Sequence, residues 1–295
     1  MGQDGYKLVE LANGGSSIHS LAHGETFHPV IGPAAEAEAL YVRQLDLRAK
    51  FRERGKEFVV WDVGLGAAAN PLTILRSTVD IPALIRVVSF DNTTEPLTFA
   101  LQHSGALGYL DGYEDRLRQL IECGKIDFSD GAQRVRWSLH LGDFPALLRT
   151  LLQARSGDFR DALPAPDVIL FDAFSPAKNP AMWTLPLFTN LFHLLDPGRP
   201  CVMPTYSRST MLRVTLLLAG FFVGAGHATG EKEETTIAAN HAGLICEPLD
   251  LNWLTRAEKS TSAEPLYNTV YRQAPLAAAT LEKLKLHPQF QVELG

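Results

Sequence analysis

Residues 58–71 read Phe-Val-Val-Trp-Asp-Val-Gly-Leu-Gly-Ala-Ala-Ala-Asn-Pro, an apolar run that ends in Asp62 and passes into a turn with two glycines. A short apolar run of this kind is typical of a strand buried within a parallel sheet. Gly64 and Gly66 allow a tight turn and a close approach of the backbone to a ligand, and a helix that begins after the turn directs its N-terminus at the same point. The stretch therefore predicts a strand–turn–helix unit.

The glycine turn alone leaves three interpretations open. A dinucleotide-binding turn and a methyltransferase turn both place glycines in this way, with Ala69 in the third small position. A structural tight turn would need no ligand. The residues at the ends of the neighbouring strands must decide among them.

Predicted strands and helices alternate along the rest of the chain. We expect strands at 58–63, 86–91, 135–141, 167–173, 199–206, 221–227 and 234–240. This alternation favours an α/β fold with a Rossmann-like, mostly parallel sheet covered by helices. The last two strands lie close in sequence and predict an antiparallel hairpin at one edge.

An extension precedes this alternating region. Residues 6–21 surround an Asn13-Gly-Gly turn and predict a β-hairpin, and Gly32-Pro33 predicts the start of a helix that runs to about Gly55. We therefore expect three parts: 1–57 as a hairpin and helix extension packed on the core, 58–249 as the ligand-binding α/β domain, and 250–295 as a C-terminal extension.

Composition excludes several classes of protein. The chain has 295 residues, 46% of them hydrophobic, and a formal charge of −6, which argues against a protein that coats nucleic acid non-specifically. It has neither a secretory signal pattern nor an apolar run long enough to span a membrane. Three scattered cysteines indicate neither a disulfide framework nor a zinc site. We expect a cytoplasmic protein without a metal.

Polar residues follow three further strands. Asp91 and Asn92 end the second strand, where a carboxylate is placed to accept from ribose hydroxyls, although Asp91 could instead cap a helix. Asp143 can accept from an exocyclic amine such as that of adenine and Phe144 can cover its ring, although Asp-Phe-Pro also starts helices. Asp172 ends the fourth strand, where the alternative is a buried structural acid.

The exit from the fourth strand is the most distinctive segment. It reads Asp172-Ala-Phe-Ser-Pro-Ala-Lys-Asn-Pro-Ala-Met-Trp183, a stiff loop whose residues exceed what a turn requires. This run resembles the methyltransferase domain of the tRNA 5-methylaminomethyl-2-thiouridine biosynthesis enzymes (MnmC type), in which it reads Asp-Gly-Phe-Ala/Ser-Pro-x-x-Asn-Pro-x-Met-Trp. The resemblance covers most of residues 36–240 and includes Glu38-Ala-Leu-Tyr41-Val before the first strand.

The resemblance implies a class I methyltransferase fold and transfer of a methyl group from S-adenosylmethionine to an amine nitrogen of a tRNA wobble uridine. Asp172 would be the catalytic residue, orienting the amine, and no metal is implied. The cofactor would be bound by Asp62, Gly64, Gly66, Asn70, Asp91, Asn92, Asp143, Phe144 and Asp172. The substrate would be bound by Glu38, Tyr41, Phe174, Ser175, Pro176, Lys178, Asn179 and Trp183.

The tRNA assignment has one candidate surface and several alternatives. Between Arg43 and Lys56, basic residues outnumber acidic ones, which indicates either a polyanion-binding surface or a solvated helix face. The chain departs from the family pattern at Ala67, Ala68, Ala173 and in the acidic segment 230–234. An aminopropyltransferase-like enzyme, a small-molecule N-methyltransferase and a non-catalytic cofactor-binding protein therefore remain alternatives.

Overall fold

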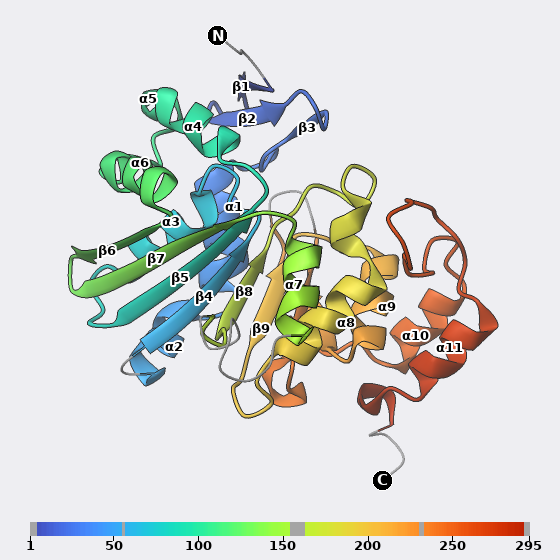
Figure 1. Cartoon of the computed structure of the whole chain (residues 1–295). Helices are drawn as coiled ribbons and strands as arrows, with labels where there is room; N and C mark the ends of the chain where they lie inside the picture. The colour runs from blue at the N-terminus through green and yellow to red at the C-terminus, as the bar shows by residue number, and fades with distance from the viewer. Residues whose placement is uncertain (1–4, 55–56, 154–162, 230–232, 292–295) are drawn as a thin grey trace. The chain divides into compact units, whose positions relative to one another are not determined.

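The strand that carries Asp62 lies among parallel strands, as the sequence predicts. The computed structural model describes residues 5–54, 57–153, 163–229 and 233–291 (Figure 1). β4 (Glu57–Val63) pairs in parallel with β5 (Leu84–Asp91) and with β8 (Val168–Phe171). β5 pairs in parallel with β7 (Gln133–Leu141), and β6 (Lys125–Asp130) pairs with β7 in the antiparallel sense. Within this part the strand order is β8-β4-β5-β7-β6.

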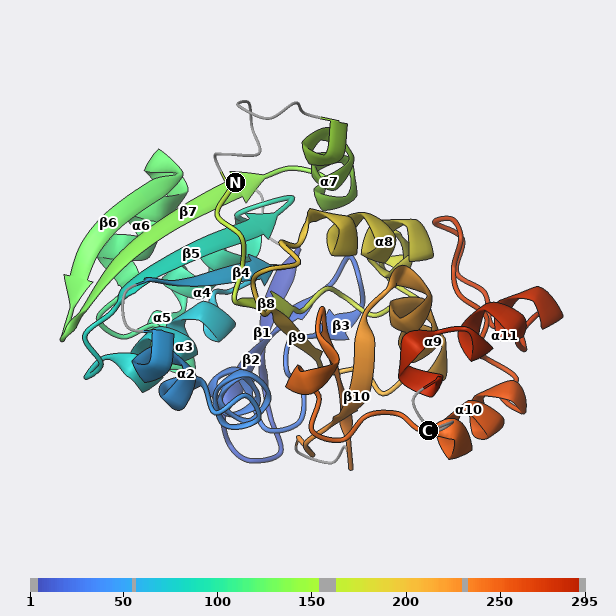
Figure 2. The same ribbon diagram turned by 90° about the horizontal axis from the view of Figure 1, so that it is seen from below.

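The two elements that flank the glycine turn are almost wholly buried. In β4 every residue from Phe58 to Val63 is buried, and in α3 (Ala69–Thr78) most side chains are buried too. Three helices follow β5: α4 (Glu95–Gln102), α5 (Ser104–Leu107) and α6 (Glu114–Cys123). In Figures 1 and 2, α6 lies beside β6 and β7. Because both flanking elements are packed on all sides, the turn between them is held rigidly.

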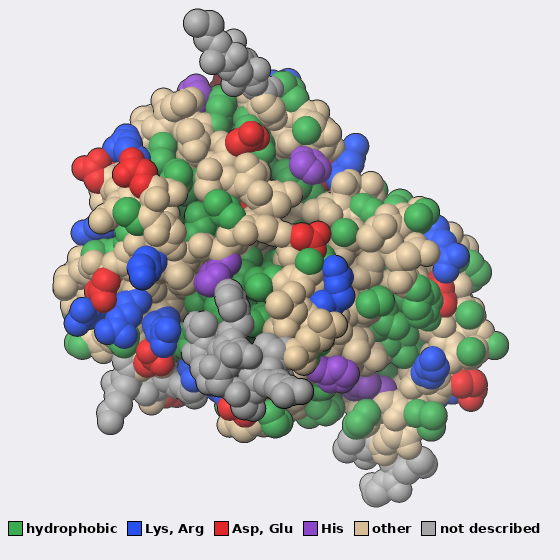
Figure 3. Space-filling model, in the orientation of Figure 1, with side chains coloured by type: hydrophobic (Ala, Val, Ile, Leu, Met, Phe, Trp, Pro, Cys, Tyr) green, Lys and Arg blue, Asp and Glu red, His purple; other side chains and the backbone are tan. Residues whose placement is uncertain are grey.

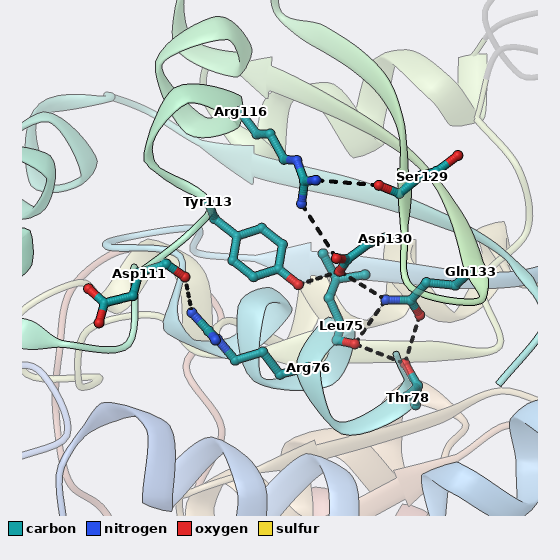
Figure 4. A network of polar contacts seen from close by, with 9 residues as sticks. All are labelled: Leu75, Arg76, Thr78, Asp111, Tyr113, Arg116, Ser129, Asp130 and Gln133. Atoms are coloured by element: carbon teal, nitrogen blue, oxygen red, sulfur yellow. Dashed lines mark hydrogen bonds and ion pairs between the residues drawn. The ribbon is translucent and has the colours of Figure 1, made fainter. Parts of the chain in front are cut away.

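A polar network ties α3 to the β6–β7 hairpin at the end away from the glycine turn (Figure 4). Gln133 donates from Nε2 to the Leu75 carbonyl at 2.9 Å and accepts from Thr78 Oγ1 at 3.1 Å. Asp130 accepts from the Tyr113 hydroxyl and, at 3.5 Å, from Arg116. These contacts satisfy polar groups that the packing of α3 would otherwise bury without partners.

The N-terminal extension confirms the predicted hairpin and corrects the predicted helix. β1 (Tyr6–Glu10) and β2 (Ser16–Ser20) pair in the antiparallel sense, and β3 (Glu25–Thr26) adds to β2. The single helix expected from Pro33 to about Gly55 is instead α1 (Pro33–Ala37), a π-helix η1 (Glu38–Arg43) and α2 (Leu47–Arg54). The break lies at Asp46, whose φ of 44° is incompatible with a continuous right-handed helix.

The chain forms two compact units. The first comprises the described residues within 1–143, 168–172 and 227–233, and the second those within 144–167, 173–226 and 234–295. The second unit contains α7 (Phe144–Gln153), η3 (Pro180–Trp183), α8 (Leu185–Leu194), β9 (Val202–Thr205), α9 (Thr210–Ala219), β10 (Phe222–Gly226), β11 (Thr235–Ala239), η4 (Ala242–Leu244), α10 (Leu251–Glu258), α11 (Ala278–Lys285) and η5 (Pro288–Phe290). The three sequence segments expected above do not coincide with these units and stay a prediction.

The predicted α/β class with mostly parallel strands is confirmed. The predicted antiparallel hairpin is present in the second unit, where β11 pairs in the antiparallel sense with both β10 and β9. We did not predict β6 from the sequence; in this strand exposed residues alternate with less exposed ones. Among the described residues no helix is both long and apolar enough to cross a membrane.

Candidate active site

The glycine turn after β4 is held by the end of β5. Gly64 and Gly66 have φ values of 93° and 51°, in the left-handed region that favours glycine. The N–H groups of Gly64 and Leu65 both donate to the Phe90 carbonyl, at 2.9 and 3.2 Å. Ala68, with φ of 63°, precedes α3 and offers no side-chain cap. The first N–H groups of α3 therefore lack the cap that a polar side chain usually supplies.

Asp91 lies against this turn rather than capping a helix with its side chain. Its Oδ2 accepts from the Gly66 N–H at 2.9 Å, and its Oδ1 accepts from the Asn92 N–H at 2.7 Å. Burial raises the pKa of Asp91, while these backbone donors act in the opposite direction. A carboxylate has about four lone-pair sites, so this one retains the capacity to accept from ligand hydroxyls.

The turn after β7 is joined to the end of β5, but its acid is exposed. The Gly142 N–H donates to the Asp91 carbonyl at 2.8 Å, which brings the Gly142-Asp143 turn beside Asp91. Asp143 and Asn92 are both exposed. Both side chains are therefore accessible to a ligand, and their cofactor-binding roles stay predictions.

Asp62 is fully buried, with 0% relative exposure. Its Oδ2 accepts from Ser89 Oγ at 2.7 Å, and Ser89 Oγ in turn accepts from Trp137 Nε1 at 2.9 Å. Burial raises the pKa of Asp62 to about 7; the Ser89 hydrogen bond lowers it, and Asp172 and Asp91 raise it further. Since these two carboxylates act on Asp62 electrostatically, the ends of β4, β5 and β8 bring three acids together, as the sequence predicts.

Asp172 follows β8 and is held in place by other residues of the first unit. Its N–H donates to the Val63 carbonyl at 3.0 Å, and its Oδ2 accepts from Asn70 Nδ2 at 2.8 Å. Asn70 itself is buried on α3. Two buried acceptors have no hydrogen-bond partner among the described residues: the Oδ1 of Asn70 and the Oδ1 of Asp62. Buried polar atoms are normally satisfied, so both atoms indicate a place where a ligand donor binds.

The buried Asp62 predicts a pH dependence of stability. Its folded pKa of about 7 lies above the value of an unfolded Asp, so between about pH 4 and pH 7 the folded chain keeps a proton that the unfolded chain has lost. Stability therefore falls as pH rises through this window and levels off above it, by about 4 kcal/mol at most. The side-chain amide in the Asp62→Asn variant is neutral at every pH. Chemical denaturation of this variant should therefore show a markedly smaller loss of unfolding free energy between about pH 4.5 and pH 8 than the unaltered protein shows. An equal loss in the variant would contradict the assignment.

The structure adds residues that sequence reasoning missed, all from the N-terminal extension. A Cβ added to Gly66 would lie 3.3 Å from the Phe27 ring, so that ring covers the glycine turn. Tyr6 contacts Phe27 edge-on, with ring centroids 6.4 Å apart. His28 Nε2 lies 3.5 Å from Asp172 Oδ2 and its Nδ1 lies 3.8 Å from Glu36 Oε2. The adjacent Phe27-His28-Pro29 in an otherwise polar loop was the one available signal.

The loop after Asp172 belongs to the second unit, where local hydrogen bonds shape it. The Ser175 carbonyl accepts from the N–H groups of Lys178 and Asn179, at 2.9 and 2.8 Å. Trp183 Nε1 donates to the Phe174 carbonyl at 2.7 Å. Lys178 is exposed, and Phe174, Ser175, Pro176 and Asn179 are partly exposed. Trp183 has 0% relative exposure, so its ring presents no open face to a base.

Three other predicted site residues are engaged or buried. Glu38 accepts from Ser77 Oγ at 2.8 Å and from Arg43 Nε at 3.4 Å. Tyr41 is buried in η1, and Phe144 is buried at the start of α7 in the second unit. The roles of these three residues in binding substrate or cofactor stay predictions.

This arrangement suits a cationic ligand with hydroxyl and amine donors. Three neighbouring carboxylates favour positive charge, and the buried acceptors of Asp62 and Asn70 await N–H or O–H donors. The glycine turn gives the ligand access to backbone. No cluster of His, Cys, Asp and Glu able to hold a metal ion occurs among the residues that the structure describes.

Comparison with known proteins finds one matching family and several similar curated sequences. Residues 111–241 match a family described as S-adenosyl-L-methionine-dependent methyltransferase. The tRNA 5-methylaminomethyl-2-thiouridine biosynthesis bifunctional protein MnmC of Stutzerimonas stutzeri is 27% identical over 264 residues, which are 86% of this chain and 38% of that protein. The MnmC protein of Cupriavidus metallidurans is 27% identical over 239 residues, covering 77% of this chain and 33% of that protein.

A solved structure has a similar fold. MNMC2 from Aquifex aeolicus superposes with a TM-score of 0.67 at 21% identity, covering 96% of this chain and 83% of that one. The chain spans less than two fifths of the length of the two curated relatives named above, 38% and 33%.

Proposed function

We propose that the chain is an S-adenosyl-L-methionine-dependent methyltransferase similar to the methyltransferase half of the MnmC proteins, and that it methylates an amine nitrogen on a modified wobble uridine of tRNA. The observation that carries the proposal is the joining of Asp62, Asp91 and Asp172 around the glycine turn. Burial raises the pKa of Asp62 and of Asp91, and a sulfonium bound beside them would favour their charged forms, so the acids and a cationic ligand stabilise each other.

The residues of the first unit fit S-adenosylmethionine. Asp91 would accept from the ribose hydroxyls, as carboxylates do at the end of the second strand in related folds. The buried Oδ1 atoms of Asp62 and Asn70 would accept from the amino group of the methionine part. Gly64 and Gly66 would let the backbone approach the ligand. Asp143 and Asn92 would contact the adenosine from the exposed side.

When bound, S-adenosylmethionine supplies an electrophilic methyl group. The chain's own task is to present a neutral amine in line with it, and orientation of this kind lowers a barrier by up to about 7–11 kcal/mol. Asp172 would accept a hydrogen bond from the amine N–H and aim the lone pair. Asn70, which holds Asp172 Oδ2 at 2.8 Å, keeps that carboxylate in position. After transfer, Asp172 would take the proton that the new ammonium releases.

The acceptor would contact the loop that follows Asp172. Phe174 and Pro176 would pack on the modified base, and Ser175, Lys178 and Asn179 would contact its polar edge or a phosphate. Because Trp183 is buried and donates to the Phe174 carbonyl, we assign it the role of holding this loop rather than of stacking on the base. Glu38 and Tyr41, both in the N-terminal extension, would also take part in substrate binding.

A tRNA substrate needs a basic surface, and the stretch from Arg43 to Lys56 is the candidate. Arg43 lies 3.4 Å from Glu38, and Arg48 lies 2.7 Å from Asp80, so two of its cations are paired within the protein. Arg52 is exposed, while Lys56 lies outside the described residues. On the face drawn in Figure 3, several basic side chains gather at the lower left, with a few acidic side chains among them. We therefore propose that Arg52 makes a local phosphate contact on this surface.

The test is transfer from methyl-labelled S-adenosylmethionine to tRNA purified from cells that lack the gene. Mass spectrometry of the nucleosides should locate one added methyl group on the wobble uridine, and none in tRNA from cells with the gene. Small amines, including polyamines, serve as competing acceptors. Label only in a small amine would overturn the tRNA substrate, and absence of label from every acceptor would overturn amine methylation.

A further inference from the structure

His28 has an unusual backbone conformation beside the proposed catalytic residue. It lies between β3 and α1 with φ of 47°, in the left-handed region that non-glycine residues seldom adopt. Such strain persists only where surrounding structure holds it, and it concentrates at functional sites. The conformation directs the imidazole toward the end of β8, where Asp172 lies.

Each ring nitrogen of His28 lies near a different carboxylate. Nε2 is 3.5 Å from Asp172 Oδ2, and Nδ1 is 3.8 Å from Glu36 Oε2 on α1. The three side chains are largely enclosed, with relative exposures of 11% for His28, 17% for Asp172 and 10% for Glu36. Low exposure limits screening by solvent, so the charges act strongly on one another.

We propose that Glu36, His28 and Asp172 form a proton relay. In this relay His28 is a positioning residue that acts through Asp172 and removes the proton that Asp172 has taken from the amine. This inference rests on the proposed methyl transfer to an amine. It adds residues of the N-terminal extension to the function of that site and accounts for the placement of His28, which cofactor binding does not require.

The proton steps balance. The amine lone pair forms the new N–C bond, and the electron pair of the broken C–S bond stays on sulfur. The resulting ammonium gives one proton to the Asp172 carboxylate, which passes it to Nε2 of the neutral imidazole. The imidazolium is stabilised by Glu36 and loses its Nδ1 proton through Glu36 to water, which leaves the neutral Nε2–H tautomer. Exchange with water then removes the Nε2 proton and returns one to Nδ1, so that Nε2 can accept from Asp172 in the next turnover. A histidine changes charge readily near neutral pH, as this cycle requires.

The charged groups around His28 favour transfer of the proton from Asp172 to the imidazole. Glu36 faces it from α1 and Asp172 from the end of β8; Asn70 from α3 is neutral and donates to Asp172 at 2.8 Å. Asp172 is also electrostatically coupled to Asp62. The N···O separations exceed hydrogen-bond length, and pairs of this kind commonly shorten when the substrate binds.

The experiment compares His28→Gln and Glu36→Gln with the unaltered protein. His28→Gln keeps an N–H donor but cannot carry a proton, so kcat for methyl transfer should fall by about 10²-fold while the Kd for S-adenosylhomocysteine stays within about threefold. Glu36→Gln should reduce kcat less. Added imidazole should restore part of the rate of His28→Ala. The exposed His193 provides the control, since His193→Gln should retain the original kcat.

A second measurement needs no turnover. In proton NMR of the protein without substrate, the His28 ring N–H resonance should shift in Asp172→Asn and, separately, in Glu36→Gln, and disappear in His28→Gln. An unchanged kcat in His28→Gln, or a ring resonance that neither carboxylate variant moves, would overturn the relay. If the unaltered protein methylates no amine, the proposed function fails, whereas the NMR result still tests the coupling of the three residues.

Discussion

Asp172→Asn should lower the rate of methyl transfer by about 10²–10⁴-fold while the chain still binds S-adenosylhomocysteine. The amide keeps an oxygen that can accept from Asn70, whose Nδ2 now lies 2.8 Å from Asp172 Oδ2, so the local structure should persist. It loses the negative charge and the ability to take a proton from the amine. The loss should therefore appear in kcat, measured with saturating cofactor and tRNA.

The matched control is Asp115→Asn on α6. This carboxylate has 98% relative exposure and pairs with the exposed Arg118, so its removal changes the net charge equally without altering the site. It should leave kcat unchanged. If Asp172→Asn turns over at the rate of this control, Asp172 does not orient the amine, and the catalytic assignment is wrong.

Trp183→Ala should lower the free energy of unfolding by about 3–5 kcal/mol, the largest stability effect expected for a residue near the site. The indole has 0% exposure, contacts Tyr206 edge-on at 6.1 Å between ring centroids, and donates to the Phe174 carbonyl. Truncation leaves a cavity and an unpaired carbonyl. Urea denaturation followed by circular dichroism measures the change.

Two variants separate packing from loop position. Trp183→Phe keeps most of the ring but loses the N–H, and should cost about 1–2 kcal/mol while raising the KM for the acceptor. Leu286→Ala, at a side chain with 74% exposure, should change stability by less than about 0.5 kcal/mol. If Trp183→Ala and Leu286→Ala unfold with the same midpoint in urea denaturation, the indole is not part of the core.

The sequence anticipated elements whose pattern is local. The apolar run of β4, the two glycines and the strand-end acids Asp62, Asp91 and Asp172 are all visible in short windows, and the structure joins these acids as expected. We missed β6 although polar and apolar residues alternate through most of Lys-Ile-Asp-Phe-Ser-Asp, because a periodic run of six residues is too short to decide an edge strand. The break at Asp46 was also missed, since Asp adopts a positive φ more often than most residues but too seldom for the residue type alone to predict one.

By itself, the sequence determined the parallel α/β arrangement and the acids at its strand ends, because strand propensity and side-chain alternation act over a few residues. Only the tertiary structure decided that Trp183 is buried, that Asp91 binds the Gly66 N–H, and that His28 reaches Asp172. Those facts depend on contacts between residues far apart in the chain, whose energies arise when packing excludes water and no local pattern encodes them.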